Sequence, residues 1–243
     1  MSLYGLKRKL ERERKRVTNV VSLVEHETIL EGAFVRDGMS VVGRRVKRAF
    51  DFLFACILIM LLSPLYLVIF IAIKLDDGAS AIYTQERIGR YGHVFKIYKF
   101  RSMRVDAEVD GPQLSVPMNS DKADERMTRV GSFLRQHHLD ELPQLWNIVK
   151  GEMSFVGYRP ERKFFIDKIM KHDKRYVCLY QSRPGLTSYA TLYNGYTDTM
   201  EKMLKRLEYD LYYLQHRSWL YDMKIILKTF WSALSGKDLV KFQ

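Results

Sequence analysis

The feature that most constrains this chain is its single long apolar run, AFDFLFACILIMLLSPLYLVIFIAI, which extends from Ala49 to Ile73. A straight helix of about 25 residues would reach about 37 Å, enough to cross a bilayer. Ser63 and Pro64 stand in its middle, however, and a proline within a helix removes one hydrogen bond and clashes with the preceding turn. We therefore expect a break or kink there, with two arms of about 20 Å, each too short to span alone.

Basic residues flank this run on both sides. Arg44, Arg45, Lys47 and Arg48 precede it, and Lys74, Arg87, Arg90, Lys96, Lys99, Arg101 and Arg104 follow it. Basic flanks favour the cytoplasmic face, so a re-entrant segment that enters and returns satisfies both of them. A kinked spanning helix remains open, because prolines are tolerated in many membrane spans. Asp51, near the start of the run, can pair with Arg48 or Arg44.

The formal net charge of +12 on 243 residues predicts a polyanionic partner. Nucleic acid, an anionic lipid surface and phosphorylated small substrates all fit that charge. Cys56 and Cys178 are too few and too far apart for a disulfide framework or a CxxC metal site, which favours a reducing cytosolic setting.

The chain divides into three parts: residues 1–43, a basic N-terminal arm and linker; residues 44–75, the membrane segment; and residues 76–243, a cytosolic domain. In the third part, AIYTQERI and HVFKIYKFRSM flank a glycine-containing turn and predict a β-hairpin. Residues 105–123 predict a loop that could cover a site. Helices are expected at residues 124–137, 140–150 and 161–173.

Two amphipathic patterns follow near the C-terminus. Leu204, Leu207, Leu211 and Leu214 form the first, and Trp219, Met223, Ile226 and Phe230 form the second. Helices in the lipid headgroup layer and helices packed on the core are both consistent with these patterns. The expected fold class is α+β and mostly helical, a monotopic membrane protein with a re-entrant helix-break-helix, a small hairpin and interfacial helices.

An acidic pair lies inside the segment LDELPQLWNIVKGEMSFVGYRP. Asp140 and Glu141 stand at the start of an apolar, helical pattern. Two adjacent carboxylates can hold a hard divalent cation, and one of them can attack phosphorus. The alternative interpretation is that the pair complements a helix dipole.

Basic residues surround this pair in the sequence, as phosphoryl transfer requires, since arginine forks and lysine charges neutralise phosphate oxygens. The predicted phosphate or nucleotide contacts are Lys99, Arg126, Arg129, Arg159 and Arg183. Arg135 is expected to pair structurally with a carboxylate, and His137 and His138 are interpreted as helix-end or surface histidines.

Several ordered motifs resemble one family. They are KRAFDF with the later SP, YTQERIGRYGHVFKIYKFRSM, TRVGSFLRQHHLDELPQLWNIVKGEMSFVGYRP, RPGLTS and EYDLYYLQHRSWLYDMKI. From about Arg44 to Leu234, the chain is similar to the bacterial sugar transferases known as monotopic phosphoglycosyl transferases, or polyprenyl-phosphate hexose-1-phosphate transferases.

The resemblance implies a reaction. Asp140 would attack the β-phosphorus of a UDP-sugar and release UMP, and Glu141 would help Asp140 to hold Mg²⁺. A polyprenyl phosphate, typically undecaprenyl phosphate, would then take the sugar phosphate from the aspartyl intermediate. The resemblance also favours the re-entrant form with its break at Ser63 and Pro64.

The same likeness implies a place in the cell. It puts the protein on the bacterial inner membrane with its catalytic domain facing the cytoplasm, at the first membrane step of exopolysaccharide, capsule, O-antigen (lipopolysaccharide) or glycoprotein glycan synthesis. The implied partners are a UDP-sugar, a polyprenyl phosphate and the lipid bilayer, without nucleic acid. A homo-oligomer is left open.

The chain departs from the family pattern at two places in this core. Tyr158 stands where a GPRP turn usually has proline, so we expect a less rigid backbone before Arg159. The stretch TSYATLYNG, residues 187–195, replaces the frequent TGWAQVNG form and leaves the identity of the sugar undetermined.

Two other function classes compete with the transferase. A non-enzymatic basic membrane adaptor would use the apolar segment and the arginines for binding alone. A metal-dependent nucleic-acid-binding protein would fit the net charge and the carboxylates, but it gives no reason for the membrane segment.

Overall fold

The computed structural model describes residues 34–107, 126–194, 197 and 199–235. Within them the helices are α2 (Val41–Leu61), α3 (Ser63–Asp77), α4 (Arg129–Gln136), α5 (Gln144–Lys150), α6 (Lys163–His172), α7 (Tyr189–Asn194), α8 (Met200–His216) and α9 (Trp219–Ser235). The strands are β1 (Ile82–Ile88), β2 (Val94–Phe100), β3 (Ser154–Val156) and β4 (Gly185–Thr187). Three 3₁₀ turns are η1 (Arg90–Gly92), η2 (Leu139–Glu141) and η3 (Lys174–Gln181). The described residues are thus mostly helical with a small hairpin, as predicted.

The apolar run forms two helices rather than one. Ser40 begins α2 by accepting a hydrogen bond from the Gly43 amide at 3.1 Å. Pro64 lies in the first turn of α3, where its missing amide hydrogen costs nothing, and α2 and α3 meet at a bend of 62°. Within the described ranges no single helix has both the length and the apolar composition to cross a bilayer, whereas this bent pair together has both.

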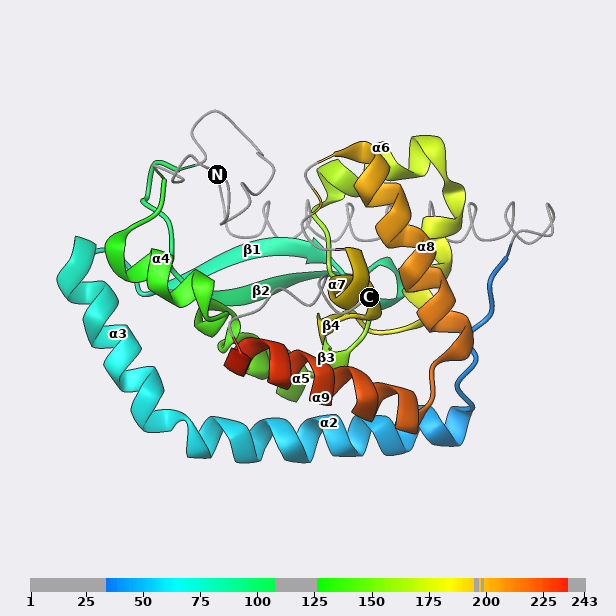
Figure 1. Cartoon of the computed structure of the whole chain (residues 1–243), viewed down its shortest axis with the longest axis horizontal. Coiled ribbons are helices and arrows are strands. Elements are labelled where there is room, and N and C mark those ends of the chain that lie inside the picture. The colour runs from blue at the N-terminus through cyan, green and yellow to red at the C-terminus, as the bar shows by residue number, and fades with distance from the viewer. Residues whose placement is uncertain (1–33, 108–125, 195–196, 198, 236–243) are drawn as a thin grey trace, which may run out of the picture.

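Figure 1 shows α2 along one edge of the molecule with α9 beside it, while α3 turns away from the end of α2 towards α4. The α2 helix begins at Val41, three residues before the predicted membrane segment.

The predicted hairpin is confirmed. Strands β1 and β2 pair antiparallel with Ile82 opposite Phe100 and Ile88 opposite Val94. The turn η1 closes it, with Tyr91 in the left-handed region at φ 58°. This register places Lys99 near the end of β2 that lies away from the turn.

A second, parallel pair of strands was not predicted. β3 and β4 pair through Ser154 with Gly185 and Val156 with Thr187. Gly157 and Gly185 make their close approach possible, because a Cβ on Gly157 would lie 2.3 Å from the Arg183 carbonyl oxygen. Strands of three residues carry too little periodicity to be seen in a sequence.

The helix predicted at residues 140–150 is only partly correct. Asp140 and Glu141 lie in the turn η2, and regular helix begins only at Gln144, after Pro143. The helices predicted at 124–137 and 161–173 are found as the shorter α4 and α6. The predicted loop at 105–123 lies largely outside the described residues.

The two C-terminal amphipathic patterns separate into different environments. In α8 the side chains of Leu207, Leu211 and Leu214 are buried against α6 and η3, which is core packing. In α9 only part of the apolar surface is buried, since Leu220, Leu227, Phe230 and Trp231 are exposed while Ile225 joins the core.

Candidate active site at the acidic pair

The turn η2 carries the acidic pair between α4 and α5. His138 precedes it in the left-handed conformation at φ 56° and ψ 18°, which is uncommon for a residue with a side chain and often marks functional sites. Leu139 and Leu142, on either side of the pair, pack against an apolar cluster that includes Ile73 and Phe100. The apolar neighbours therefore hold the turn in place, with Asp140 only 5% exposed.

Lys99 and Arg159 converge on one oxygen of Glu141. The Lys99 ammonium donates to Glu141 Oε1 at 2.7 Å, and an Arg159 guanidinium nitrogen lies 3.4 Å from the same oxygen. Lys99 is farther from Asp140, with Nζ 4.0 Å from Oδ2. The structure thus brings together four of the predicted site residues, which are separated by up to 60 positions in the sequence.

The surroundings shift the pKa values of the two carboxyl groups in opposite directions. Burial raises the pKa of Asp140, and the charge of Glu141 raises it further, against the opposing effect of Lys99. Burial would also raise the pKa of Glu141, but the positive charges of Lys99 and Arg159 outweigh it and hold this pKa far below its usual range. Glu141 is therefore ionised at neutral pH, while Asp140 is the more easily protonated member.

Asp140 Oδ1 is buried and makes no hydrogen bond to any described residue. A buried acceptor without a partner is costly, and at a candidate site it is consistent with a catalytic role or with a bound water or ion. No group of three or more metal-ligating side chains is found in the described part of the chain. Mg²⁺ commonly binds through one or two carboxylates, completing its shell with water and substrate phosphates, so Asp140 and Glu141 fit that cation.

Asn147 fixes β2 beside the turn. Its fully buried side-chain amide donates to the Lys96 carbonyl and to Glu152, both at 2.7 Å, and accepts from the Tyr98 amide at 3.1 Å. Two of these contacts are with the β2 backbone just before Lys99. Sequence reasoning missed this role, because an asparagine in an apolar helix gives no sign of the strand it will contact.

The two helices of the broken apolar run are tied to the same region. Tyr66 of α3 donates to the Leu142 carbonyl at 2.6 Å. Arg48 of α2 donates to the Ile148 and Val149 carbonyls at 2.6 and 2.8 Å, at the end of α5. Hence both arms of the broken helix hold the segment that follows the acidic pair.

The remaining predicted contacts lie elsewhere. Arg129 is exposed at the start of α4, and the Arg126 carbonyl accepts from the Arg104 amide at 2.8 Å. Arg183 donates to the Gly151 carbonyl at 2.8 Å and lines a pocket that includes neither Asp140 nor Glu141. In the described residues neither Arg129 nor Arg183 makes a hydrogen bond or ion pair with the acidic pair, and the phosphate roles of all three arginines stay predictions.

Two expectations about nearby residues change. Arg135 contacts Met127 Sδ at 3.5 Å rather than a carboxylate, although its charge opposes the raised pKa of Asp140. The backbone before Arg159 does not need proline, because the Gly185 amide donates to the Tyr158 carbonyl at 2.8 Å and Tyr158 is buried in the core. The unpredicted β3–β4 pair thus gives the backbone before Arg159 a hydrogen bond that the sequence did not indicate.

Comparisons of the sequence with a family model and with known proteins agree on one family. The model of the family described as bacterial sugar transferase matches residues 41–236. An Escherichia coli (strain K12) protein named UDP-glucose:undecaprenyl-phosphate glucose-1-phosphate transferase is 38% identical over 201 residues, covering 82% of this chain and 42% of that protein.

Other relatives are covered more fully. A Caulobacter vibrioides protein of the same name is 39% identical over 191 residues, which cover 78% of this chain and 70% of that protein. The exopolysaccharide production protein ExoY of Rhizobium meliloti is 37% identical over 199 residues, covering 77% and 85%. The matched region spans less than half the length of several relatives, including 44% of an Aeromonas hydrophila protein named UDP-N-acetylgalactosamine-undecaprenyl-phosphate N-acetylgalactosaminephosphotransferase.

Proposed function

Because this chain belongs to the bacterial sugar transferase family, we propose that it transfers a sugar-1-phosphate from a UDP-sugar to a polyprenyl phosphate, most simply undecaprenyl phosphate. The observation that carries the proposal is the buried Asp140, whose Oδ1 has no partner among the described residues, beside a Glu141 held ionised by Lys99 and Arg159. Relatives named as transferases between these two substrate classes support it.

In the first step an Asp140 carboxylate oxygen attacks the β-phosphorus of the donor. A new oxygen–phosphorus bond forms, the bond from that phosphorus to the oxygen bridging the two phosphates breaks, and UMP leaves with the bonding electrons. In the second step an oxygen of the polyprenyl phosphate attacks the same phosphorus. The aspartyl–phosphate bond breaks, Asp140 regains its carboxylate, and a polyprenyl diphosphosugar is released.

Positive charge makes the attack feasible. A carboxylate repels a diphosphate, and cations beside the reacting atoms relieve this repulsion. Lys99 and Arg159 already neutralise Glu141, and their positive charges would relieve the repulsion of the donor phosphates. Bound Mg²⁺ would neutralise further phosphate charge, held by Asp140 and Glu141. Lys99 opposes the raised pKa of Asp140 and so favours its ionised form, the nucleophile.

Exposed apolar side chains support attachment to a membrane. On α2 they include Leu53, Ile57, Met60 and Leu61, and on α3 they include Leu67, Val68 and Leu75. The exposed face of α9, with Phe230 and Trp231, adds to them. Exposed apolar side chains gathered in this way mark an interaction site, and an exposed Trp suits the headgroup layer.

We place α2 and α3 as a re-entrant segment of the bacterial inner membrane, broken at Ser63 and Pro64, with the catalytic part of residues 76–243 on the cytoplasmic side. Tyr66 and Arg48 would then set the height of the acidic pair relative to the lipid phosphate. Holding two reactants at one depth supplies part of the lowering of the barrier. Family membership favours this transferase over a basic adaptor or a nucleic-acid-binding protein.

The reaction is tested by mass spectrometry of the full chain in nanodiscs. With Mg²⁺ and a panel of UDP-sugars but no acceptor, one donor should leave a phosphosugar adduct on Asp140, and adding polyprenyl phosphate should release UMP continuously. Asp140→Asn should abolish both signals. Asp167→Asn, which alters an exposed carboxylate paired with Lys163, is the matched control. Sustained turnover by Asp140→Asn would show that another group is the nucleophile.

The topology is tested by labelling with an impermeant maleimide in intact spheroplasts. Single cysteines are placed at Val42 and Glu86, both exposed and on either side of the apolar run. A re-entrant segment protects both cysteines until the membrane is permeabilised. Labelling of only one of them before permeabilisation would identify a span.

A further inference from the structure

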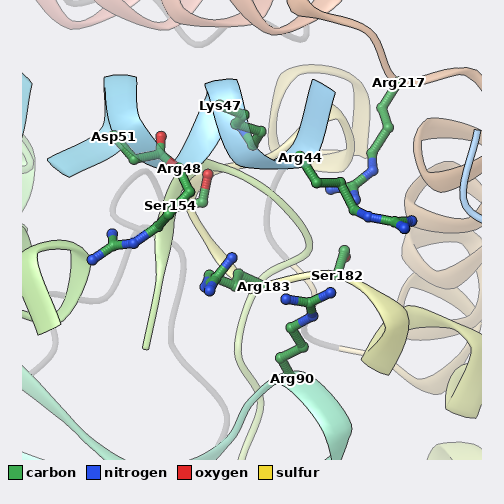
Figure 2. A pocket seen from close by; sticks show the side chains of 9 residues that line it. All are labelled: Arg44, Lys47, Arg48, Asp51, Arg90, Ser154, Ser182, Arg183 and Arg217. Atoms are coloured by element: carbon green, nitrogen blue, oxygen red, sulfur yellow. The ribbon is translucent and has the colours of Figure 1, made fainter. Parts of the chain in front are cut away.

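A second basic site lies away from the acidic pair. Its residues come from the first turns of α2, the turn η1, the start of β3, the segment before β4 and the residue after α8, and we refer to them as the basic pocket (Figure 2). They are Arg44, Lys47, Arg48, Asp51, Arg90, Ser154, Ser182, Arg183 and Arg217.

Half of the cations in the basic pocket already have carboxylate partners. Asp37, just outside it, accepts from Arg44 at 3.0 Å and from Arg217 at 2.5 Å. Lys47 donates to Asp222 at 2.5 Å. These ion pairs hold the start of α2 against the start of α9, so these three cations have a structural role.

The other three cations, Arg48, Arg90 and Arg183, contact no carboxylate among the described residues. Arg48 donates to two backbone carbonyls, Arg183 donates to the Gly151 carbonyl at 2.8 Å, and Arg90 donates to the Gln181 carbonyl at 3.1 Å. With Asp37, Asp51 and Asp222 counted against six cations, three positive charges remain uncompensated.

The neutral contacts also orient these guanidinium groups. Arg90 and Arg183 each engage a carbonyl through Nε, which leaves both terminal nitrogens available, and Figure 2 shows their guanidinium groups next to each other across the basic pocket. Burial lowers the pKa of Arg183, and the charges of Arg90 and Arg48 lower it further. Gathering like charges is unfavourable, so an anion that accepts from both forks would stabilise the arrangement.

The basic pocket is distinct from the reaction site. Arg90 stands in the turn of the hairpin, whereas Lys99 is near the other end of β2. At about 3.3 Å per residue, the strand from Val94 to Lys99 alone extends about 17 Å. A phosphate bound by Arg90 and Arg183 is therefore not the one attacked by Asp140.

We propose that the basic pocket binds a phosphate group, with Arg90 and Arg183 as its principal donors and Arg48 as a flanking charge. Arg48 directly precedes the exposed apolar part of α2 and its guanidinium lies 5.7 Å from the centre of the Phe52 ring. An anionic phospholipid headgroup and a free phosphate both offer this chemistry. Only the lipid source rests on the membrane attachment proposed above.

The first arm uses inorganic phosphate and the full chain in neutral detergent. At equal ionic strength, replacing chloride by phosphate should raise the thermal unfolding midpoint of the wild type by at least about 2 °C. Arg183→Gln and Arg90→Gln should each lose this rise. Arg90 is partly exposed on a turn, so Arg90→Gln still tests the proposal if Arg183→Gln fails to fold. Arg45→Gln, an exposed change on α2 outside the basic pocket, should keep the rise.

The second arm separates the two sources of phosphate. Binding to phosphatidylcholine vesicles with and without 30% phosphatidylglycerol is measured by sedimentation, in the absence of any donor. One exposed arginine near an anionic surface contributes about five-fold to binding. If a headgroup occupies the basic pocket, Arg183→Gln should weaken the phosphatidylglycerol-dependent binding more than ten-fold, and Arg45→Gln by five-fold or less. Equal losses would assign the pocket to free phosphate if the first arm is positive.

Two results would overturn the proposal. In the first, Arg183→Gln and Arg45→Gln lose vesicle binding equally, and the rise in the unfolding midpoint with phosphate either persists in both Arg90→Gln and Arg183→Gln or is absent from the wild type. In the second, the rise in the unfolding midpoint with phosphate disappears in Lys99→Met but not in Arg183→Gln, which would place the anion at the acidic pair. Neither arm measures turnover, so its outcome is independent of the transferase assignment.

Discussion

The Tyr66 phenol donates a 2.6 Å hydrogen bond to the Leu142 carbonyl, which joins the second arm of the broken apolar helix to the residue directly after Glu141. The Tyr66 ring also packs edge-on against Phe100 at 5.3 Å, next to Lys99 in β2. One side chain of α3 therefore contacts both segments that carry the reacting groups. Movement of α3 relative to the protein core would displace the acidic pair.

Tyr66→Phe should lower the rate of UMP release several-fold while leaving membrane binding unchanged. It removes one hydrogen bond, worth about 1 kcal/mol, but keeps the ring. Steady-state kinetics in nanodiscs and vesicle sedimentation measure the two effects. Tyr98→Phe removes an exposed phenol that contacts Lys150 and is the control. Equal rates for both variants would remove Tyr66 from the positioning of the site.

Lys99→Met should reduce turnover on the order of 100-fold, as is typical when a charge that stabilises the transition state is removed. Lys99 opposes the raised pKa of Asp140 and lowers that of Glu141, so without it both pKa values rise. The nucleophile is the ionised form, and the acidic limb of the pH–rate profile should therefore move to higher pH. Lys96→Met, an exposed change on the same strand, should leave the profile in place.

Asn147→Ala should destabilise the protein by about 3 kcal/mol, because it removes three part-buried hydrogen bonds, each worth about 1 kcal/mol. Turnover should fall as well, since the backbone before Lys99 loses its attachment to α5. Thermal unfolding in detergent and UMP release measure these effects. Asn194→Ala loses one exposed hydrogen bond to Lys202 and should change stability by less than about 1 kcal/mol. A similar loss in both variants would contradict the role of Asn147.

Asp210 makes stability depend on pH. Burial raises its pKa from 3.8 to about 8, a shift that Glu161 reinforces and Arg206 opposes. Between about pH 4 and pH 8 the folded protein keeps a proton that the unfolded chain has lost, so the free energy of unfolding falls as pH rises, by at most about 1.4 kcal/mol per unit.

Asp210→Asn should remove this contribution. The unfolding midpoint of the variant, relative to the wild type, should increase steadily from pH 5 to pH 8 and level off above that. Asp167→Asn, an exposed change on α6, serves as the control and should follow the wild type. A difference between Asp210→Asn and the wild type that does not vary with pH would mean that Asp210 is ionised in the folded protein.

Local patterns predicted the hairpin, the break at Ser63 and Pro64, and the helices that became α4, α6, α8 and α9. These elements depend on backbone geometry and on periodicities that a short window of sequence contains. Charge and position in the sequence predicted Lys99 and Arg159 as phosphate or nucleotide contacts, and their pairing with Glu141 was not predicted. Its arrangement, with both cations on Oε1 and Asp140 left the more easily protonated, required the distances.

Other features depended on contacts between distant segments. The β3–β4 pair forms because Gly157 and Gly185 allow two backbones to meet, and it contacts the chain before Arg159, where Tyr158 stands in place of the usual proline. The pattern of α8 and that of α9 looked alike, yet one helix is buried in the core and the other leaves Leu227 and Trp231 exposed. An amphipathic pattern defines an apolar face without stating what covers it.

The amino-acid sequence by itself determined the family, the acidic pair and the place where the apolar run must bend, because motifs and the covalent structure of proline act locally. Only the tertiary structure decided which cations neutralise Glu141, which contacts carry the position of α3 to Leu142, and that Arg183 joins Arg90 in a separate basic pocket. Electrostatic and hydrogen-bond energies depend on separations of a few ångströms between residues far apart in the chain, and folding alone sets those separations.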